Sequence, residues 1–137
     1  MRALEEEEQI TIINWAQWAR GKYPALQWLH HIPNGGQRSK ATAARLKAAG
    51  VKSGVPDLCL PYPCGGYHGL YIELKVGKNK PTANQNAWLD YLGGAGYCVR
   101  VCWGADEAIG EITKYLERGR KNGKNQGDAR DGGRGGN

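Results

Sequence analysis

The segment LYIELKV, from Leu70 to Val76, alternates apolar and other side chains at every second position. Successive side chains of a β-strand point to opposite faces of the sheet, so this alternation predicts a strand with two unlike faces. One face carries only apolar residues, namely Leu70, Ile72, Leu74 and Val76. The other face carries Tyr71, Glu73 and Lys75. The chain must therefore place an apolar core on one side of this strand and a carboxylate beside an ammonium group on the other.

A second predicted strand, Val55–Leu60, comes shortly before it, and its Val55, Asp57 and Cys59 share one face. The connection between the two strands, PYPCGGYHG, is rich in proline and glycine, as is typical of a loop. A short link of this kind indicates an antiparallel pair. In such a pair Asp57 and Glu73 can converge on one cleft, with Lys75 beside them.

Six further elements are predicted around these two strands. By residue range they are a helix at 5–21, a strand at Leu26–Ile32, helices at 39–50 and 82–94, a strand at 97–103 and a helix at 105–118. The helix at 82–94 has a strong start, because Thr82 and Gln85 have the T-x-x-Q spacing of a capping box. A strand–helix–strand crossover from Val76 to Tyr97 implies a parallel pair. The order α-β-α-β-β-α-β-α therefore predicts a mixed sheet flanked by helices.

The chain has 137 residues, which suits one domain, and we place it at residues 1–118. Residues 119–137, GRKNGKNQGDARDGGRGGN, contain no apolar side chain larger than alanine, so a flexible tail is expected there. The formal net charge of +6 favours a polyanionic partner. No apolar run is long enough to span a bilayer, and the glutamate-rich start does not resemble a secretory signal. A cytoplasmic protein without membrane contact is expected.

Four cysteines stand at positions 59, 64, 98 and 102, and none forms a C-x-x-C pair. A zinc site built from Cys59, Cys64 and His68 is conceivable, but the spacing matches no common zinc pattern. Buried thiols without a chemical role are the favoured interpretation.

The pairing of Asp57 with Glu73 limits the chemistry of the predicted cleft. Two carboxylates brought close repel each other unless a cation or a proton lies between them. Mg²⁺ takes one or two protein carboxylates together with waters and phosphate oxygens, and it can promote attack of a water on a phosphodiester. A nearby lysine can orient the water or stabilise the charge that develops on the phosphate. The simpler alternative is that Glu73 and Lys75 form an ion pair on an edge strand and Asp57 is a turn residue after Pro56.

The residues of this region resemble a known family. Pro56-Asp57 followed by Glu73-Leu74-Lys75 is similar to the PD-(D/E)XK nuclease signature. The ordered set PNGGQRS, LKAAGVKSGVPDLCLP and GLYIELK, followed by a glutamine, a leucine, Gly-Tyr and a valine, resembles more closely the VRR-NUC branch, of the compact stand-alone kind often encoded by phages. The resemblance covers about Glu5 to Leu116. It implies a restriction-endonuclease-like fold and metal-dependent hydrolysis of phosphodiester bonds with Mg²⁺ or Mn²⁺, without a small-molecule cofactor.

The same resemblance implies roles for individual residues. Asp57 and Glu73 would be metal ligands and catalytic residues, the backbone carbonyl of Leu74 a third ligand, and Lys75 the catalytic lysine. Family members also carry a glutamine on the helix after E-x-K, which falls on Gln85. Gln85 is also the closing residue of the capping box, and the two roles do not exclude each other.

Members of the family carry a glutamate on the first helix as well. Glu5 matches their E-x-x-x-Q spacing ahead of Gln9 and is favoured as a further metal ligand, with Glu8 as the alternative. For any single residue of this acidic run, a solvated position at the start of a helix is the simpler role.

A second group of candidate residues lies in HIPNGGQRSK. Asn34, Gly35 and Gly36 expose backbone amides ahead of a helix, and Arg38 and Lys40 are close in sequence, which suits contact with nucleic-acid phosphates. An ordinary turn before a basic, solvated helix is the alternative. The residues His30, His31 and Asn34 also invite comparison with HNH nucleases, but the ββα-metal hairpin and downstream ligand of that class have no counterpart here.

The sequence therefore favours a metal-dependent endonuclease acting on DNA, including branched or flap structures, and working as a homodimer because a small chain has little surface with which to position a junction. Two alternatives stay open: a nucleic-acid-binding module that keeps the fold without cleaving, and an interaction domain whose charged strand face is a patch of ion pairs.

Overall fold

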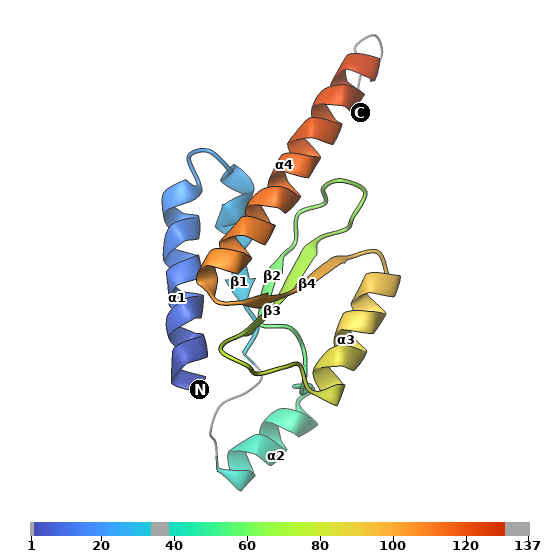
Figure 1. Ribbon diagram of the computed structural model, residues 1–137. Coiled ribbons are helices and arrows are strands. Elements are labelled where there is room, and N and C mark those ends of the chain that lie inside the picture. Colours follow the sequence, from blue (N-terminus) through green and yellow to red (C-terminus); the bar gives the residue numbers. More distant parts are fainter. Residues whose placement is uncertain (1, 34–38, 131–137) are drawn as a thin grey trace.

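The computed structural model describes residues 2–33 and 39–130, with side chains placed for 4–33 and 39–118. The elements follow the predicted order with one addition (Figure 1). They are α1 (Arg2–Ala19), the 3-10 helix η1 (Pro24–Trp28), β1 (His30–His31), α2 (Lys40–Ala48), β2 (Leu58–Leu60), β3 (Leu70–Lys75), α3 (Ala83–Gly94), β4 (Cys98–Trp103) and α4 (Ala105–Arg130).

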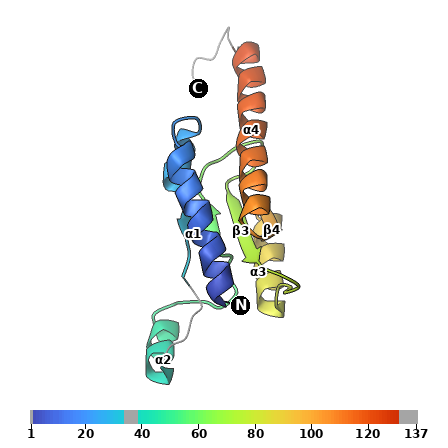
Figure 2. The ribbon, with the colours of Figure 1, turned by 60° about the vertical axis from the view of Figure 1, so that its left-hand side comes forward.

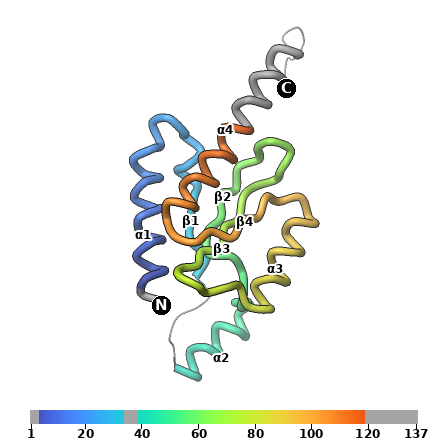
Figure 3. Tube along the Cα trace, viewed as in Figure 1, coloured from blue at the N-terminus to red at the C-terminus, as the bar shows by residue number. Residues whose placement is uncertain are grey.

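The four strands form one mixed sheet in the order β1-β2-β3-β4. The first two pairs are antiparallel, and β3 pairs in parallel with β4. The parallel pair is joined through α3, and the antiparallel pair β2–β3 through the proline- and glycine-rich loop, as the trace in Figure 3 shows. The predicted mixed sheet flanked by helices is confirmed.

The apolar core lies on the face of the sheet that α1 and α4 cover. It unites the alternate side chains of β3 with residues of both helices, principally Ile12, Ala16, Leu58, Leu60, Leu70, Ile72, Leu74, Ala108, Ile112 and Leu116. The opposite face of β3 carries Tyr71, Glu73 and Lys75. The side chains of β3 therefore separate as the alternation predicts, and both Glu73 and Lys75 are buried although they lie outside this core.

The predicted strand at Leu26–Ile32 is wrong over most of its length. The 3-10 helix η1 occupies its first part, and the strand β1 is reduced to His30 and His31. Pro24 begins η1, where its fixed φ is compatible with a helical start and its missing N–H costs no internal hydrogen bond. A short apolar run of this kind has no periodicity that separates a strand from a turn of helix.

Two other boundaries differ from prediction. The strand predicted from Val55 begins at Leu58, because Pro56 has no N–H to donate to a ladder and Gly54 has a φ of +91°. At the other end of the chain, α4 continues to Arg130 and so enters the segment predicted to be a tail. Extending a helix that is already nucleated is much easier than starting one, which accounts for the longer helix. Residues 131–137 lie outside the described part.

Among the described residues, no helix is both long enough and apolar enough to cross a membrane.

Candidate functional site

Asp57 stands immediately before β2, opposite Glu73 of β3. The antiparallel register pairs Leu58 with Ile72 and Cys59 with Tyr71. Continuing this register by one residue beyond Leu58 brings Asp57 opposite Glu73, on the face that also carries Lys75. The structure therefore brings together the two carboxylates and the lysine that the sequence placed in one cleft.

Both the main chain and the side chain of Asp57 are anchored. Its Oδ2 accepts a hydrogen bond of 2.7 Å from the backbone N–H of Leu74. Its carbonyl oxygen accepts two more, from the backbone N–H of Ile32 and from Nδ1–H of His31, each at 2.8 Å. These three bonds tie the start of β2 to both neighbouring strands, so the Asp57 carboxylate has a fixed position.

Glu73 is the unusual member of the site. It is 1% exposed, and its Oε1 is buried without a hydrogen-bond partner among the described residues. Its Oε2 lies 3.6 Å from Nζ of Lys75, which is 7% exposed. A buried carboxylate oxygen with no partner is costly, so this arrangement indicates a place for a group that would satisfy it.

The pKa values of Asp57 and Glu73 reflect the cost of burying two carboxylates side by side. Burial raises the pKa of Glu73 to about 8, the negative charge of Asp57 adds to the rise, and Lys75 opposes it. Burial also raises the pKa of Asp57, against the lowering effect of the hydrogen bond from Leu74. Without a cation, the protein resolves the repulsion between the two carboxylates by holding a proton.

The backbone carbonyl of Leu74 points to the side of β3 on which Asp57 lies. The carbonyl of Lys75 accepts a hydrogen bond of 2.9 Å from the N–H of Gly104, which follows β4. Because successive backbone carbonyls of a strand point to opposite sides, that of Leu74 points away from β4, toward the side on which its own N–H contacts Asp57. The Asp57 carboxylate, the Glu73 carboxylate and the Leu74 carbonyl thus lie on the same part of the β2–β3 pair.

This donor set fits a hard divalent cation such as Mg²⁺, which prefers oxygen ligands and keeps several waters. Among the described residues, no group of three or more His, Cys, Asp or Glu side chains is arranged to hold a metal ion. An ion at this site would therefore depend on Asp57, Glu73 and the Leu74 carbonyl, with water or substrate completing its coordination.

The two candidate glutamates of α1 have different surroundings. Oε1 of Glu8 accepts a hydrogen bond of 2.7 Å from the backbone N–H of Ala105, the first residue of α4. A carboxylate there also complements the positive end of the helix dipole. The negative charge of Glu5, in contrast, contributes to the raised pKa of Glu73. Of the two alternatives, Glu5 is the one whose charge acts on the site.

Gln85 closes the predicted capping box of α3. Its Oε1 accepts a hydrogen bond of 2.8 Å from the N–H of Thr82, and its own N–H donates to Oγ1 of Thr82 at 3.2 Å. The structural role predicted for Gln85 is confirmed. This contact occupies the side-chain oxygen and leaves the amide nitrogen available for a second role.

Most of the predicted nucleic-acid contacts lie outside the described residues, namely Asn34, Gly35, Gly36 and Arg38. Lys40, the remaining one, is the exposed first residue of α2.

Two contacts around the site were missed by the sequence interpretation. One is the bond from His31 to the Asp57 carbonyl, whose only sequence signal is the position of His31 just before the PNGG segment. The other joins the Ser53-Gly54 turn to α3, where Nδ2 of Asn84 donates to Oγ of Ser53 at 2.8 Å. The glycine two residues before Pro56-Asp57 was a signal for this close approach.

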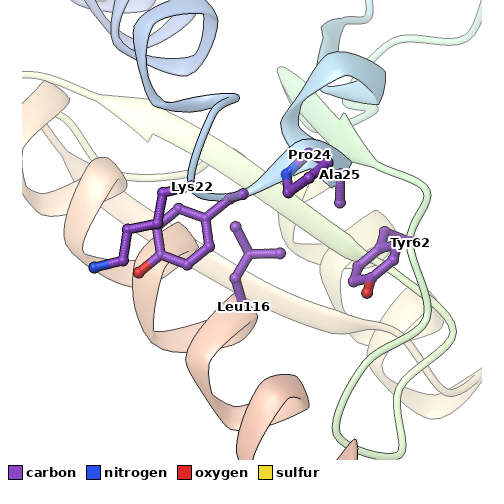
Figure 4. A pocket seen from close by; sticks show the side chains of 6 residues that line it. Lys22, Pro24, Ala25, Tyr62 and Leu116 are labelled. Carbon is purple, nitrogen blue, oxygen red and sulfur yellow. The ribbon is translucent and has the colours of Figure 1, made fainter.

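All four cysteines are buried free thiols. Cys64 lies in the loop between β2 and β3, and its Sγ contacts the carbonyl of Tyr115 at 3.2 Å. The same loop contributes Tyr62 to an open pocket of about 170 Å³ that is separate from the carboxylates (Figure 4). Lys22 and Tyr62 lie at opposite sides of it, and its full lining is Lys22, Tyr23, Pro24, Ala25, Tyr62 and Leu116.

Comparison with known proteins matches this chain to a family model and to a solved structure. The model of the VRR-NUC domain family matches residues 4–106. A solved structure described as a VRR_NUC domain protein is similar at 36% sequence identity, with a TM-score of 0.72, over 85% of this chain and 90% of that one. A search of curated protein sequences gave no match.

Proposed function

This chain belongs to the VRR-NUC domain family, a family of nuclease-type domains, and from that membership we propose that it is a metal-dependent endonuclease that hydrolyses DNA phosphodiester bonds. The observation that carries the proposal is the position of Glu73. Its buried and unpartnered Oε1 lies opposite Asp57 and one residue before the carbonyl of Leu74, in a strand whose other face is apolar core. A buried carboxylate with only a structural role is expected to have hydrogen-bond partners for both of its oxygens.

Each residue has a defined part in the proposed reaction. Asp57, Glu73 and the Leu74 carbonyl would hold the divalent cation, and Glu5 would add negative charge to the site. When bound, the ion would supply Lewis-acid chemistry, favouring deprotonation of a water and offsetting charge on the phosphate. Lys75, held 3.6 Å from Glu73, orients that water and stabilises the charge that develops in the transition state. The amide nitrogen of Gln85, which the capping box does not use, is proposed to assist in the same role.

The proposed substrate is DNA, including branched structures such as flaps and four-way junctions, and the proposed working form is a homodimer that presents two sites to two strands. The excess of positive charge supports a polyanionic substrate. The small size of the domain supports the dimer, because one copy offers little surface for positioning a junction.

The test is cleavage of labelled linear, flap and four-way DNA in Mg²⁺, in Mn²⁺ and in EDTA, by the unaltered chain and by Lys75→Ala. We expect cleavage only with metal, and a loss of at least about a hundredfold in Lys75→Ala. Lys114→Ala is the matched control, because Lys114 is exposed on α4. Circular dichroism and melting temperature establish that Lys75→Ala is folded.

The alternatives give different results in the same experiment. Binding of DNA without cleavage in either metal would point to a non-cleaving module with this fold. Neither binding nor cleavage would point to an interaction domain. Cleavage that survives Lys75→Ala would contradict the site, although not the nuclease activity itself.

A further inference from the structure

The helix α2 stands apart from the body of the protein. None of its residues is buried. Figures 1 and 2 show it projecting from the end of the molecule at which α1 and α3 begin. A helix of nine residues is marginal in water, and most helices of this length depend on packing of an apolar face. Another source of order is therefore needed for α2.

That source is local, and it lies at both ends of the helix. At the start, Oγ of Ser39 accepts a hydrogen bond of 3.1 Å from the N–H of Thr42. At the end, the N–H of Val51 donates to the carbonyl of Leu46, and that of Gly50 to the carbonyl of Lys47, each at 3.0 Å. With Gly50 at a φ of +108°, these two bonds form a Schellman motif. The alanine-rich middle adds high helix propensity, so α2 is ordered while its sides stay in solvent.

The charge of α2 has one sign. Its exposed cations are Lys40, Arg45 and Lys47, and Lys52 follows in the link toward the site. Lys40 and Lys47 are seven residues apart, which places them on the same side of the helix about 10 Å from each other. No aspartate or glutamate occurs in the sequence between Glu8 and Asp57. The helix is therefore cationic without internal compensation.

The segment that follows α2 packs against α3 and leads to Asp57 of the candidate site. The side chain of Ser53 is bonded to Asn84 in the first turn of α3, next to Gln85. A Cβ on Gly54 would come within 2.8 Å of the backbone of Asn84, so the two segments are in close contact. Asp57 follows three residues later. The segment that follows α2 is thus attached to the start of α3 and leads directly into Asp57.

We propose that α2 is a docking helix for the sugar–phosphate backbone of the nucleic acid that the candidate site acts on, an inference that rests on the proposed function. A protein partner is normally anchored by buried apolar or aromatic side chains, and α2 offers only alanines and the half-buried Leu46. A polyanion needs no such anchor, because phosphates bind exposed cations with release of counterions. Duplex DNA carries one charge about every 1.7 Å of its axis with both strands counted, so Lys40 and Lys47, on the same side of α2, can both contact phosphates. Arg45 lies about 140° around the helix from Lys40 and adds positive charge to the other side.

The experiment measures binding rather than cleavage, so that it stays separate from the test of the nuclease. Lys75→Ala serves as the parent chain, in EDTA, with fluorescein-labelled duplex and flap DNA at several salt concentrations. The test variant adds Lys40→Gln, Arg45→Gln and Lys47→Gln, which keep helix propensity. The control variant instead adds Arg20→Gln, Lys22→Gln and Lys114→Gln, which remove the same charge from the turn after α1 and from α4.

We expect the test variant to bind DNA at least about tenfold more weakly than the control variant at low salt, with equal loss on unrelated sequences. The slope of log K against log salt should fall by about 2–3, since each lost phosphate contact removes about 0.9. Equal weakening in the two variants would overturn the proposal, because net charge alone would then explain the effect. Sedimentation of both variants measures their self-association. If loss of the α2 cations changes self-association and leaves the affinity for DNA intact, the proposal is also overturned. Cleavage by the chain with Lys75 intact decides the nuclease separately.

Discussion

At the scale of single residues, Glu73 occupies a position that would suit an apolar side chain. It is almost fully buried, lies opposite another carboxylate and has one oxygen without a partner among the described residues. Such a group is tolerated only when it is protonated or bound to a cation. The sequence indicates the two carboxylates and their register, because strand alternation is local. The lack of a partner for Oε1 depends on every element around it, so only the structure shows it.

The raised pKa of Glu73 predicts how the metal-free protein responds to pH. The unfolded chain ionises Glu73 near 4.5, whereas the folded chain holds the proton up to about pH 8. Between these values the folded state binds more protons than the unfolded state, so stability falls as pH rises and levels off above pH 8. We expect a loss on the order of a few kcal/mol across this window in EDTA. Thermal or urea unfolding at several pH values measures it.

Glu73→Gln removes this titration and should flatten the pH dependence relative to the unaltered chain. Exposed Glu6→Gln is the control and should leave the profile as it is. Adding Mn²⁺ at pH 8 should stabilise the unaltered chain and not Glu73→Gln, since only an intact site binds the ion. A profile that is the same in all three proteins contradicts the burial of a protonated Glu73.

His31 offers a second prediction at this scale. Its Nδ1–H bonds the Asp57 carbonyl, so His31→Ala should let Asp57 move and weaken Mn²⁺ binding roughly tenfold. His31→Asn should restore most of the affinity, because the side-chain amide can donate from a similar position. The rise in melting temperature with added Mn²⁺ gives the affinity without relying on cleavage. His30→Ala is the matched control, since Nδ1 of His30 bonds Trp28 instead, and equal behaviour of the two alanine variants would contradict the role.

At the scale of elements, local signals predicted most of the fold, and the errors fall where local signals are ambiguous. The capping box of α3 is encoded within four residues and forms as predicted, and the serine cap of α2 is equally local. The segment Leu26–Ile32 fails because a short apolar run suits either a strand or a turn of helix, and the packing of neighbours decides between them. The choice between Glu5 and Glu8 also depends on packing, since it follows from where α4 begins relative to α1.

The contact between the Ser53-Gly54 turn and α3 predicts a specific sensitivity at Gly54. Its φ of +91° already disfavours a side chain, and a Cβ would lie 2.8–2.9 Å from the backbone and Cβ of Asn84. Gly54→Ala should therefore cost backbone strain of about 1–2 kcal/mol and a further roughly 1–3 kcal/mol for the clash. Gly66→Ala is a close control, because its φ is +89° and nothing lies within 4 Å of the added atom.

Urea unfolding of both variants measures the difference in stability. Gly54→Ala should also lower cleavage at temperatures where the protein is folded, because displacement of the turn shifts Asp57, three residues further along the chain. Equal destabilisation by the two substitutions would show that the turn and α3 are not closely packed.

At the scale of the whole molecule, charge and apolar surface are distributed unevenly. The start of α1, which is rich in glutamate, and the cationic helix α2 lie toward the same end of the molecule (Figure 1). Large apolar side chains are exposed along α1, where Leu4, Ile10 and Trp18 lie in solvent. Exposed apolar groups of this size are typical of surfaces that bind another protein chain.

This surface allows a test of the proposed homodimer. If the outer side of α1 forms the contact, the chain should sediment at twice its mass of 15.0 kDa, with about 800 Å² buried on each copy. Trp18 is 83% exposed and would be a dominant contact, so Trp18→Glu should weaken the dimer by roughly thirtyfold or more. Tyr91 is 67% exposed on α3 and provides the matched control, because Tyr91→Glu adds the same charge at another surface.

Dissociation by Tyr91→Glu alone would move the interface to α3. A single chain mass for the unaltered protein at micromolar concentration would contradict the dimer altogether, and cleavage of a four-way junction would then have to proceed one strand at a time.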